Sequence, residues 1–248
     1  MTEKIALITG ANKGIGYATA QGLGKAGVTV LVGARSPERG EQAAAKLRAE
    51  GHDAAFVRLD VTDRQTITAA AEHVEATYGK LDILVNNAGI ALADGGWNTS
   101  ELTVATTRKI FETNVFGVIA VTNAFLPLVR RSEAGRIVNV SSEVGSLATM
   151  TRDDLPSWLQ PGAYGASKSA LNMLTVSYSI ELRETPIKIN AVTPGFTKTD
   201  FNDNRGDRNV QEAAQIAIDM ALIGDDGPSG TFVCDGHVDY VDGETVPW

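Results

Sequence analysis

Seven apolar, β-rich runs separated by segments of helical periodicity constrain the fold of this 248-residue chain more than any other feature. Each run is continuously apolar instead of alternating, which is typical of strands buried on both faces of a parallel sheet. We therefore expect an α/β fold with a doubly wound, mainly parallel seven-stranded sheet and helices on both faces. The expected strands are residues 5–9, 29–33, 55–59, 83–85, 136–140, 187–192 and 231–234.

The rest of the composition points to one globular domain over residues 1–248, since no linker or repeat divides the chain. A net charge of −8 argues against a nucleic-acid partner, and the lack of a long apolar run argues against a membrane span. The first apolar run starts near Lys4, which leaves no room for a signal peptide, and Cys234 is the single cysteine. We expect a cytoplasmic protein. We expect no metal site, because the histidines lack ligand spacing: His52, His73 and His237.

A glycine-rich turn connects the first expected strand to a helix that begins near Tyr17, an arrangement typical of the Rossmann fold. Glycines let the backbone approach a pyrophosphate, and the helix N-terminus supplies amide donors and a favourable dipole. Such turns also need glycine for backbone reasons alone, so the glycines indicate a phosphate site only together with other motifs. The residues assigned to the cofactor here are Gly10, Asn12, Lys13, Gly14, Ile15 and Gly16.

The end of the second strand indicates which dinucleotide is bound. In an NAD-binding fold an acidic residue near this point takes the ribose 2′-hydroxyl, yet residues 34–36 contain no carboxylate. Arg35 and Lys13 instead suit a 2′-phosphate, because guanidinium matches phosphate geometry. We therefore expect NADP, with NADPH preferred over NADH. Arg39 fits the same role and fits equally well as the start of a solvated helix.

Tyr164 and Lys168 lie four residues apart at the start of a segment with helical periodicity that begins at Gly162. In a helix they share one face, so the ammonium is expected to lower the tyrosine pKa and to allow proton exchange near neutral pH. The same pair also suits an ordinary helix start with a half-buried tyrosine and a solvated lysine. The upstream motifs decide between the two interpretations.

The motifs, taken in order, resemble the short-chain dehydrogenase/reductase family over residues 4–236. They are Gly10-x-x-x-Gly14-x-Gly16, Asn86-Asn87-Ala88-Gly89, Asn114 within the helical pattern of residues 101–131, Ser141-Ser142 at a strand end, Tyr164-x-x-x-Lys168 and Pro194-Gly195-x-x-x-Thr199. Tyr164 follows Ser142 by 22 positions, a longer interval than in many members, which resembles the carbonyl-reductase branch.

The resemblance implies a catalytic set of Asn114, Ser142, Tyr164 and Lys168. Ser142 and Tyr164 would hydrogen-bond the substrate carbonyl, Tyr164 would donate the proton, and Asn114 would help to hold a water linked to Lys168. Ser141 is the nearest competitor of Ser142, and a tolerated mid-helix asparagine is the alternative for Asn114. Further cofactor contacts implied by the resemblance are Asp60, Val61, Asn87, Ala88, Gly89, Tyr164, Lys168, Pro194, Gly195, Thr197 and Thr199. Either Thr62 or Asp63 is expected to cap the helix that follows Asp60.

The longer interval places an inserted loop at about residues 147–161, over the active site. Its Leu155 suits an apolar pocket, although a surface insertion without a substrate role fits the sequence nearly as well. The expected substrate-pocket residues are Trp97, Ser142, Glu143, Val144, Trp158 and Phe196. In the resembled branch such a segment obstructs subunit packing, which leaves monomer or homo-oligomer undecided.

The resulting hypothesis is an NADPH-dependent oxidoreductase that reduces a small-molecule ketone or aldehyde to an alcohol. The alternatives are a ketoacyl reductase, an alcohol dehydrogenase working in the oxidative direction, an epimerase or dehydratase, and a non-catalytic NADP-binding sensor. The physiological substrate, the stereochemistry and the role of the acidic tail, residues 225–248, stay open.

Overall fold

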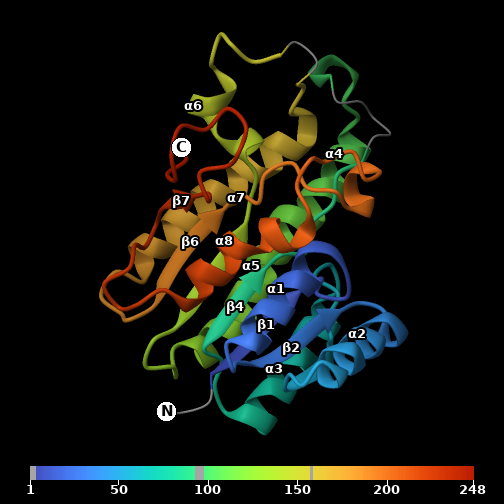
Figure 1. Ribbon diagram of the computed structural model, residues 1–248, viewed down its shortest axis with the longest axis vertical. Coiled ribbons are helices and arrows are strands. Elements are labelled where there is room, and N and C mark those ends of the chain that lie inside the picture. Colours follow the sequence, from blue (N-terminus) through green and yellow to red (C-terminus); the bar gives the residue numbers. More distant parts are fainter. Residues whose placement is uncertain (1–3, 93–97, 157–158) are drawn as a thin grey trace.

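The computed structural model describes residues 4–92, 98–156 and 159–248 (Figure 1). Its centre is a seven-stranded sheet in which every neighbouring pair is parallel, in the order β3-β2-β1-β4-β5-β6-β7. The strands are β1 (Ile5–Thr9), β2 (Thr29–Ala34), β3 (Ala54–Arg58), β4 (Ile83–Asn86), β5 (Arg136–Val140), β6 (Lys188–Val192) and β7 (Phe232–Val233). The expected doubly wound α/β fold is confirmed, and the sheet is wholly parallel.

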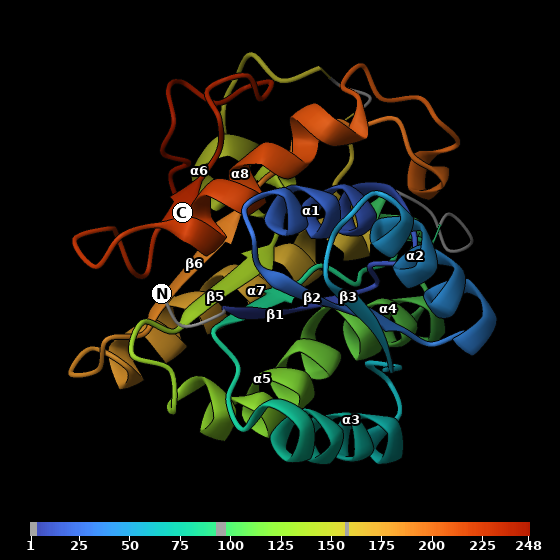
Figure 2. The same ribbon diagram turned by 60° about the horizontal axis from the view of Figure 1, so that its bottom comes forward.

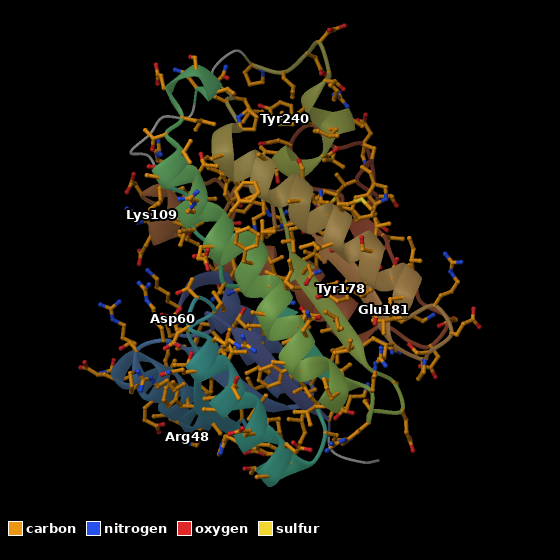
Figure 3. The ribbon with its side chains drawn as sticks, turned by 180° about the vertical axis from the view of Figure 1, so that it is seen from behind. Arg48, Asp60, Lys109, Tyr178, Glu181 and Tyr240 are labelled. Atoms are coloured by element: carbon orange, nitrogen blue, oxygen red, sulfur yellow. The ribbon has the colours of Figure 1, made fainter. Side chains whose placement is uncertain are left out.

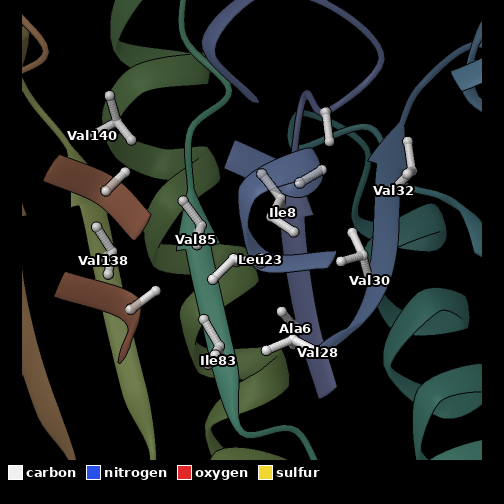
Figure 4. Packing of buried hydrophobic residues seen from close by; sticks show 14 of the residues in the cluster. Ala6, Ile8, Leu23, Val28, Val30, Val32, Ile83, Val85, Val138 and Val140 are labelled. Atoms are coloured by element: carbon white, nitrogen blue, oxygen red, sulfur yellow. The ribbon is translucent and has the colours of Figure 1, made fainter. Parts of the chain in front are cut away.

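The strands are continuously apolar because both faces of the sheet are covered. In β1, Ala6 and Ile8 join one buried cluster, whereas Ile5 and Leu7 join the other. Figure 4 shows the first cluster, in which Ile8 packs between neighbouring strands and helix residue Leu23. Successive residues of the strand therefore alternate between two buried clusters, one on each face of the sheet, and not between core and solvent.

Three helices cover each face, as Figure 2 shows for α1 and α8 on one side and α3 and α5 on the other. The first face carries α1 (Gly14–Lys25), α2 (Pro37–Ala49) and α8 (Val210–Leu222), and the second carries α3 (Arg64–Tyr78), α5 (Gly117–Val129) and α7 (Gly162–Glu181). Asp63 caps α3 by accepting a hydrogen bond from the backbone of Gln65, so one of the two expected caps is the observed one.

The helical pattern expected at residues 101–131 is broken into α4 (Val104–Phe111), a π-helical turn η2 (Glu112–Phe116) and α5. Seen from behind, they form one continuous run beside α7 (Figure 3). By length and apolar composition the run Val104–Val129 is sufficient to cross a membrane, which corrects the expectation that no such stretch exists. The most apolar 18-residue window of the run is 56% buried, and Val121 and Phe125 pack in the core against the sheet, which accounts for its apolar character.

The strand order places the site. Strands β1 and β4 are neighbours although two strands separate them in the chain, so the chain direction across the sheet reverses between them. Ligands of open α/β sheets bind outside the carboxyl ends of the strands at this switch point. The glycine turn, the Asn-Asn-Ala-Gly motif and the two serines all follow carboxyl ends there, at the upper edge of the sheet in Figure 1.

Candidate active site

Lys168 lies on α7 one turn after Tyr164 and is not solvated. Its side chain is 4% exposed, and its Nζ donates a hydrogen bond to the carbonyl oxygen of Val140 over 2.7 Å. The ammonium lies 5.6 Å from the centre of the Tyr164 ring. Burial lowers the pKa of Lys168 to about 8. The solvated lysine of the alternative interpretation is therefore wrong, whereas its half-buried tyrosine is observed.

The pKa of Tyr164 moves in the opposite direction from the sequence prediction. Burial of the phenol raises the pKa, the negative charge of Glu143 raises it further, and only a hydrogen bond with Ser142 lowers it. Lys168 makes no contribution to this shift, and its ammonium hydrogen-bonds the carbonyl oxygen of Val140 instead of the phenol. Tyr164 is consequently a neutral phenol at neutral pH, the form that donates a proton.

The structure separates the two serines that the sequence leaves in competition. Ser141 is buried, and its hydroxyl donates to the side-chain oxygen of Asn172 over 2.6 Å. Ser142 is half-buried and stands at the start of the short helix η3 (Glu143–Gly145), within hydrogen-bond reach of Tyr164. Only Ser142 therefore presents its hydroxyl where Tyr164 can share a ligand.

The side chain of Asn114, in the π-helical turn η2, is held by three hydrogen bonds. Its oxygen accepts from the backbone N–H of Ile90 (2.8 Å), while its amide nitrogen donates to the carbonyl of Ile90 (2.9 Å) and to Ser167 Oγ (3.0 Å). The Ser167 hydroxyl donates in turn to the backbone carbonyl of Tyr164 over 2.6 Å. Asn114 thus ties the strand-end loop after β4 to the helix that carries Tyr164.

Gly89 shows how close these groups are. A Cβ placed on Gly89 would lie 3.4 Å from Asn114 Oδ1 and 3.6 Å from Lys168 Nζ. The end of the Asn-Asn-Ala-Gly motif therefore passes directly over both side chains. Asn87, in the same motif, donates from its amide to the carbonyl of Thr9 over 2.8 Å and so joins β4 to the glycine turn.

The glycine turn fits a dinucleotide phosphate. Gly10 and Gly14 have positive φ angles of 67° and 58°, and a Cβ on Gly16 would lie 2.4 Å from the amide nitrogen of Asn87. Lys13 precedes α1 without offering its first amides a side-chain cap, and the first turn contains no carboxylate. Those amide groups therefore stay available to an anion.

Arg35 and Lys13 are the cations expected at the ribose 2′-position, and their surroundings in the structure differ. Arg35 follows β2, is exposed, and forms no ion pair with any part of the chain that the structure describes. Lys13 is instead paired with Asp200, whose Oδ2 lies 2.8 Å from its Nζ. Both side chains of this pair are largely exposed, so the pair is weak and exchangeable.

The remaining expected cofactor contacts surround the same edge. Asp60, labelled in Figure 3, uses one carboxylate oxygen to accept from the backbone and the hydroxyl of Thr62. Gly195 turns the chain after β6 with a φ of 71°, and the hydroxyl of Thr197 donates to its carbonyl over 3.0 Å. Thr199 then caps the short helix η4 (Asp200–Asn202). This turn meets the glycine turn, because a Cβ on Gly14 would lie 3.7 Å from Thr199.

Sequence reasoning missed the contribution of η4. Phe201 packs edge-on against Tyr164, with ring centres 5.5 Å apart and planes at 62°, and it is partly exposed. Asp200 in the same turn holds Lys13. The only signal in the sequence was an isolated Phe after the Pro-Gly turn, which had no periodic pattern to place it.

The other expected pocket residues have mixed outcomes. Glu143 accepts a hydrogen bond from Ser142 over 3.1 Å, Val144 is half-buried, and Phe196 is 45% exposed. Trp97 and Trp158 lie outside the described residues. The pocket assignments of these two tryptophans therefore stay predictions.

The inserted loop begins with the short helix α6 (Leu147–Met150), which contacts the acidic tail instead of standing free. Ser146 Oγ donates to the carbonyl of Pro247 over 2.5 Å, and the backbone N–H of Ala148 donates to that of Trp248 over 3.1 Å. Arg152 pairs with Asp242 over 2.9 Å beside a cavity of about 200 Å³. The tail, to which the sequence assigned no role, thus packs on the inserted segment, as the adjacent ribbons in Figure 1 show.

The chain is similar in sequence to a known family and to several of its members. A family model described as short chain dehydrogenase matches residues 4–210. A short-chain dehydrogenase of Penicillium roqueforti, anuI, is 38% identical over 236 residues and covers 90% of both chains. Carbonyl reductase [NADPH] 1 of Mus musculus is 33% identical over 277 residues, which is 96% of this chain and 98% of the relative.

A solved structure gives the same result in three dimensions. The gluconate 5-dehydrogenase of Burkholderia cenocepacia J2315, in complex with NADP and tartrate, superposes with a TM-score of 0.82 at 28% identity. The match covers 98% of this chain and 95% of that one. The two proteins therefore share their fold over nearly the whole of this chain.

Proposed function

The chain belongs to the short-chain dehydrogenase family and is an oxidoreductase of the reductase kind, and from this we propose that it uses NADPH to reduce a ketone or aldehyde with Tyr164 as the proton donor. The observation that carries the proposal is the convergence of Ser142 and Tyr164, both half-buried, with Lys168 and Asn114 buried behind them. Two hydroxyls at one point are what a carbonyl oxygen needs as charge develops on it.

The proton that the reduced carbonyl oxygen needs comes from a side chain of the protein. The Ser142 O–H would turn from Glu143 to the substrate carbonyl oxygen, to which Tyr164 would also donate, and NADPH, when bound, would supply a hydride to the carbonyl carbon. As the carbon–oxygen double bond becomes an alkoxide, the phenol O–H of Tyr164 breaks and its proton passes to that oxygen. The raised pKa of Tyr164 keeps the phenol protonated beforehand, so the direction of this shift favours reduction.

Lys168 and Asn114 lie behind Tyr164 and support its proton transfer. With a pKa of about 8, Lys168 exchanges a proton near neutral pH, and its contact with Val140 holds it one helical turn from Tyr164. Asn114, fixed by Ile90 and Ser167, keeps its place beside Lys168. We assign to this pair the return of a proton to the tyrosinate after each turnover.

The preference for NADPH rests on the end of β2. Residues 34–36 offer Arg35 and no carboxylate, and Arg35 has no partner among the described residues. Lys13 lies on the neighbouring turn in an exposed pair that a phosphate can displace. A relative named for NADPH and a similar structure that contains NADP support the same choice.

The function is tested by following reduced-nicotinamide absorbance with NADPH and NADH in parallel, against aryl ketones, keto esters and quinones. We expect NADPH to be consumed with at least one carbonyl compound, in proportion to alcohol formed. Binding of NADPH without any consumption over the whole panel would transfer the assignment to a sensor or to a non-redox enzyme of the family.

A further inference from the structure

Glu143 is a carboxylate at the reacting centre that the proposed mechanism does not use. It follows Ser142 in the chain, and its backbone N–H donates to the hydroxyl of Thr193 over 3.2 Å. One carboxylate oxygen, Oε2, accepts from Thr193 Oγ1 over 2.6 Å and from Ser142 Oγ over 3.1 Å. The carboxylate is therefore fixed beside the hydroxyl that we assign to the substrate carbonyl.

The charge of Glu143 has no cationic partner. No Lys, Arg or His forms an ion pair with it in residues 4–92, 98–156 and 159–248. Its second oxygen, Oε1, receives no hydrogen bond from these residues, and the side chain is half-buried. The charge reaches Tyr164, where it contributes to the raised pKa of the phenol.

Neighbouring carboxylates differ from Glu143 in this respect. Asp200 is paired with Lys13, and Asp235 is paired with Arg208 beside the turn after β6. A half-buried carboxylate gives up part of its hydration, and hydroxyl donors return only part of that loss. A ligand with a positively charged group at Oε1 would supply the cationic partner that Glu143 lacks among the described residues.

We propose that Glu143 selects carbonyl substrates that carry a protonated amine within a few bonds of the carbonyl group. The inference rests on the proposed function, because the carbonyl oxygen lies at Ser142 and Tyr164 while the ammonium lies at Oε1 of Glu143. The spacing follows from the 3.1 Å between Oε2 and Ser142 Oγ, which keeps the carboxylate within a few bonds of a carbonyl held at Ser142.

The test compares two ketones of one shape. The first is a phenyl ketone with a dimethylamino group two carbons from the carbonyl, and the second has an isopropyl group in place of the amine. For each we measure kcat/KM with NADPH at neutral pH, and the dissociation constant by calorimetry with NADP present. The readout is the ratio between the two ketones, which cancels any general effect of a variant on turnover.

The variant is Glu143→Gln, whose amide oxygen still accepts from the hydroxyls of Ser142 and Thr193 but carries no charge. The control is Glu133→Gln, an exposed carboxylate before β5 at the opposite edge of the sheet. We expect the unchanged protein and the control to favour the amine by about tenfold or more, and Glu143→Gln to lose most of that preference.

The outcomes separate this inference from the proposed function. An equal ratio in the unchanged protein and in Glu143→Gln, or a preference for the neutral ketone, overturns the role of Glu143. Reduction of the neutral ketone without any preference for the amine keeps the reductase and rejects the selection. Tighter binding of the amine that Glu143→Gln loses, with neither ketone reduced, supports the selection and rejects the reductase.

Discussion

The ammonium of Lys168 lies 2.7 Å from the carbonyl oxygen of Val140, so the catalytic helix is fastened to the strand that delivers Ser142. This bond joins α7, which carries Tyr164, to the carboxyl end of β5, which Ser142 follows. It also holds a lysine where water is largely absent, which explains why its pKa falls.

The first prediction concerns stability and pH. The pKa of Lys168 is about 8 in the folded protein against 10.5 for an ordinary lysine, so between these values the unfolded chain binds one more proton. The cost of burying the charge is present below pH 8 and disappears as pH rises. Relative to Lys168→Met, the free energy of unfolding should therefore increase by about 3 kcal/mol across this interval. Urea unfolding of both proteins at several pH values measures it, and parallel curves would contradict the buried charge.

The second prediction concerns Asn114. Replacing it with alanine removes three hydrogen bonds, two part-buried ones to Ile90 and a buried one to Ser167, and takes this partner from each. We expect a loss of about 2–3 kcal/mol in the free energy of unfolding, together with reduced turnover. Asn123→Ala is the control, because this exposed residue of the same helical run accepts one bond, from Tyr178. Equal losses in the two variants would reject the structural account of the π turn.

The third prediction concerns the choice of cofactor. Arg35→Asp places a carboxylate where an NAD-binding fold has one, so the ratio of kcat/KM for NADPH to that for NADH should fall by about tenfold or more. Arg39→Asp discriminates between the two roles open to that residue, since a solvated helix start would leave the ratio unchanged. An unchanged ratio in Arg35→Asp would remove the 2′-phosphate contact from this account.

The sheet was predictable because burial on both faces leaves a plain signal. All seven strands appear where continuous apolar runs occur, and differences at their ends are small because one polar residue neither makes nor breaks a pairing. The role of Tyr164, which lies on α7, was expected only from the resemblance to the short-chain dehydrogenase/reductase family, whereas the position of Ser142 after β5 was predictable for a related reason. The carboxyl ends of parallel strands meet at one edge, and motifs that follow those ends meet there too.

Irregular segments were not predictable in the same way. The packing of Phe201 on Tyr164 and the docking of Pro247 on Ser146 depend on long-range contacts of chain without periodicity. The prediction that Lys168 lowers the pKa of Tyr164 was wrong for a similar reason. A distance of four residues indicates that Lys168 is near Tyr164, but not that the ammonium is buried or that Glu143 lies opposite.

The central claim is that Tyr164 gives the proton, and Tyr164→Phe tests it most directly. The substitution removes one hydroxyl and keeps the ring that packs on Phe201, so the pocket should keep its shape. The measurement is NADPH consumption with the best carbonyl compound of the panel, alongside NADPH binding by fluorescence. We predict that consumption disappears while NADPH binds as before. Turnover retained at a comparable rate, with intact binding, would contradict the role of Tyr164 as the proton donor.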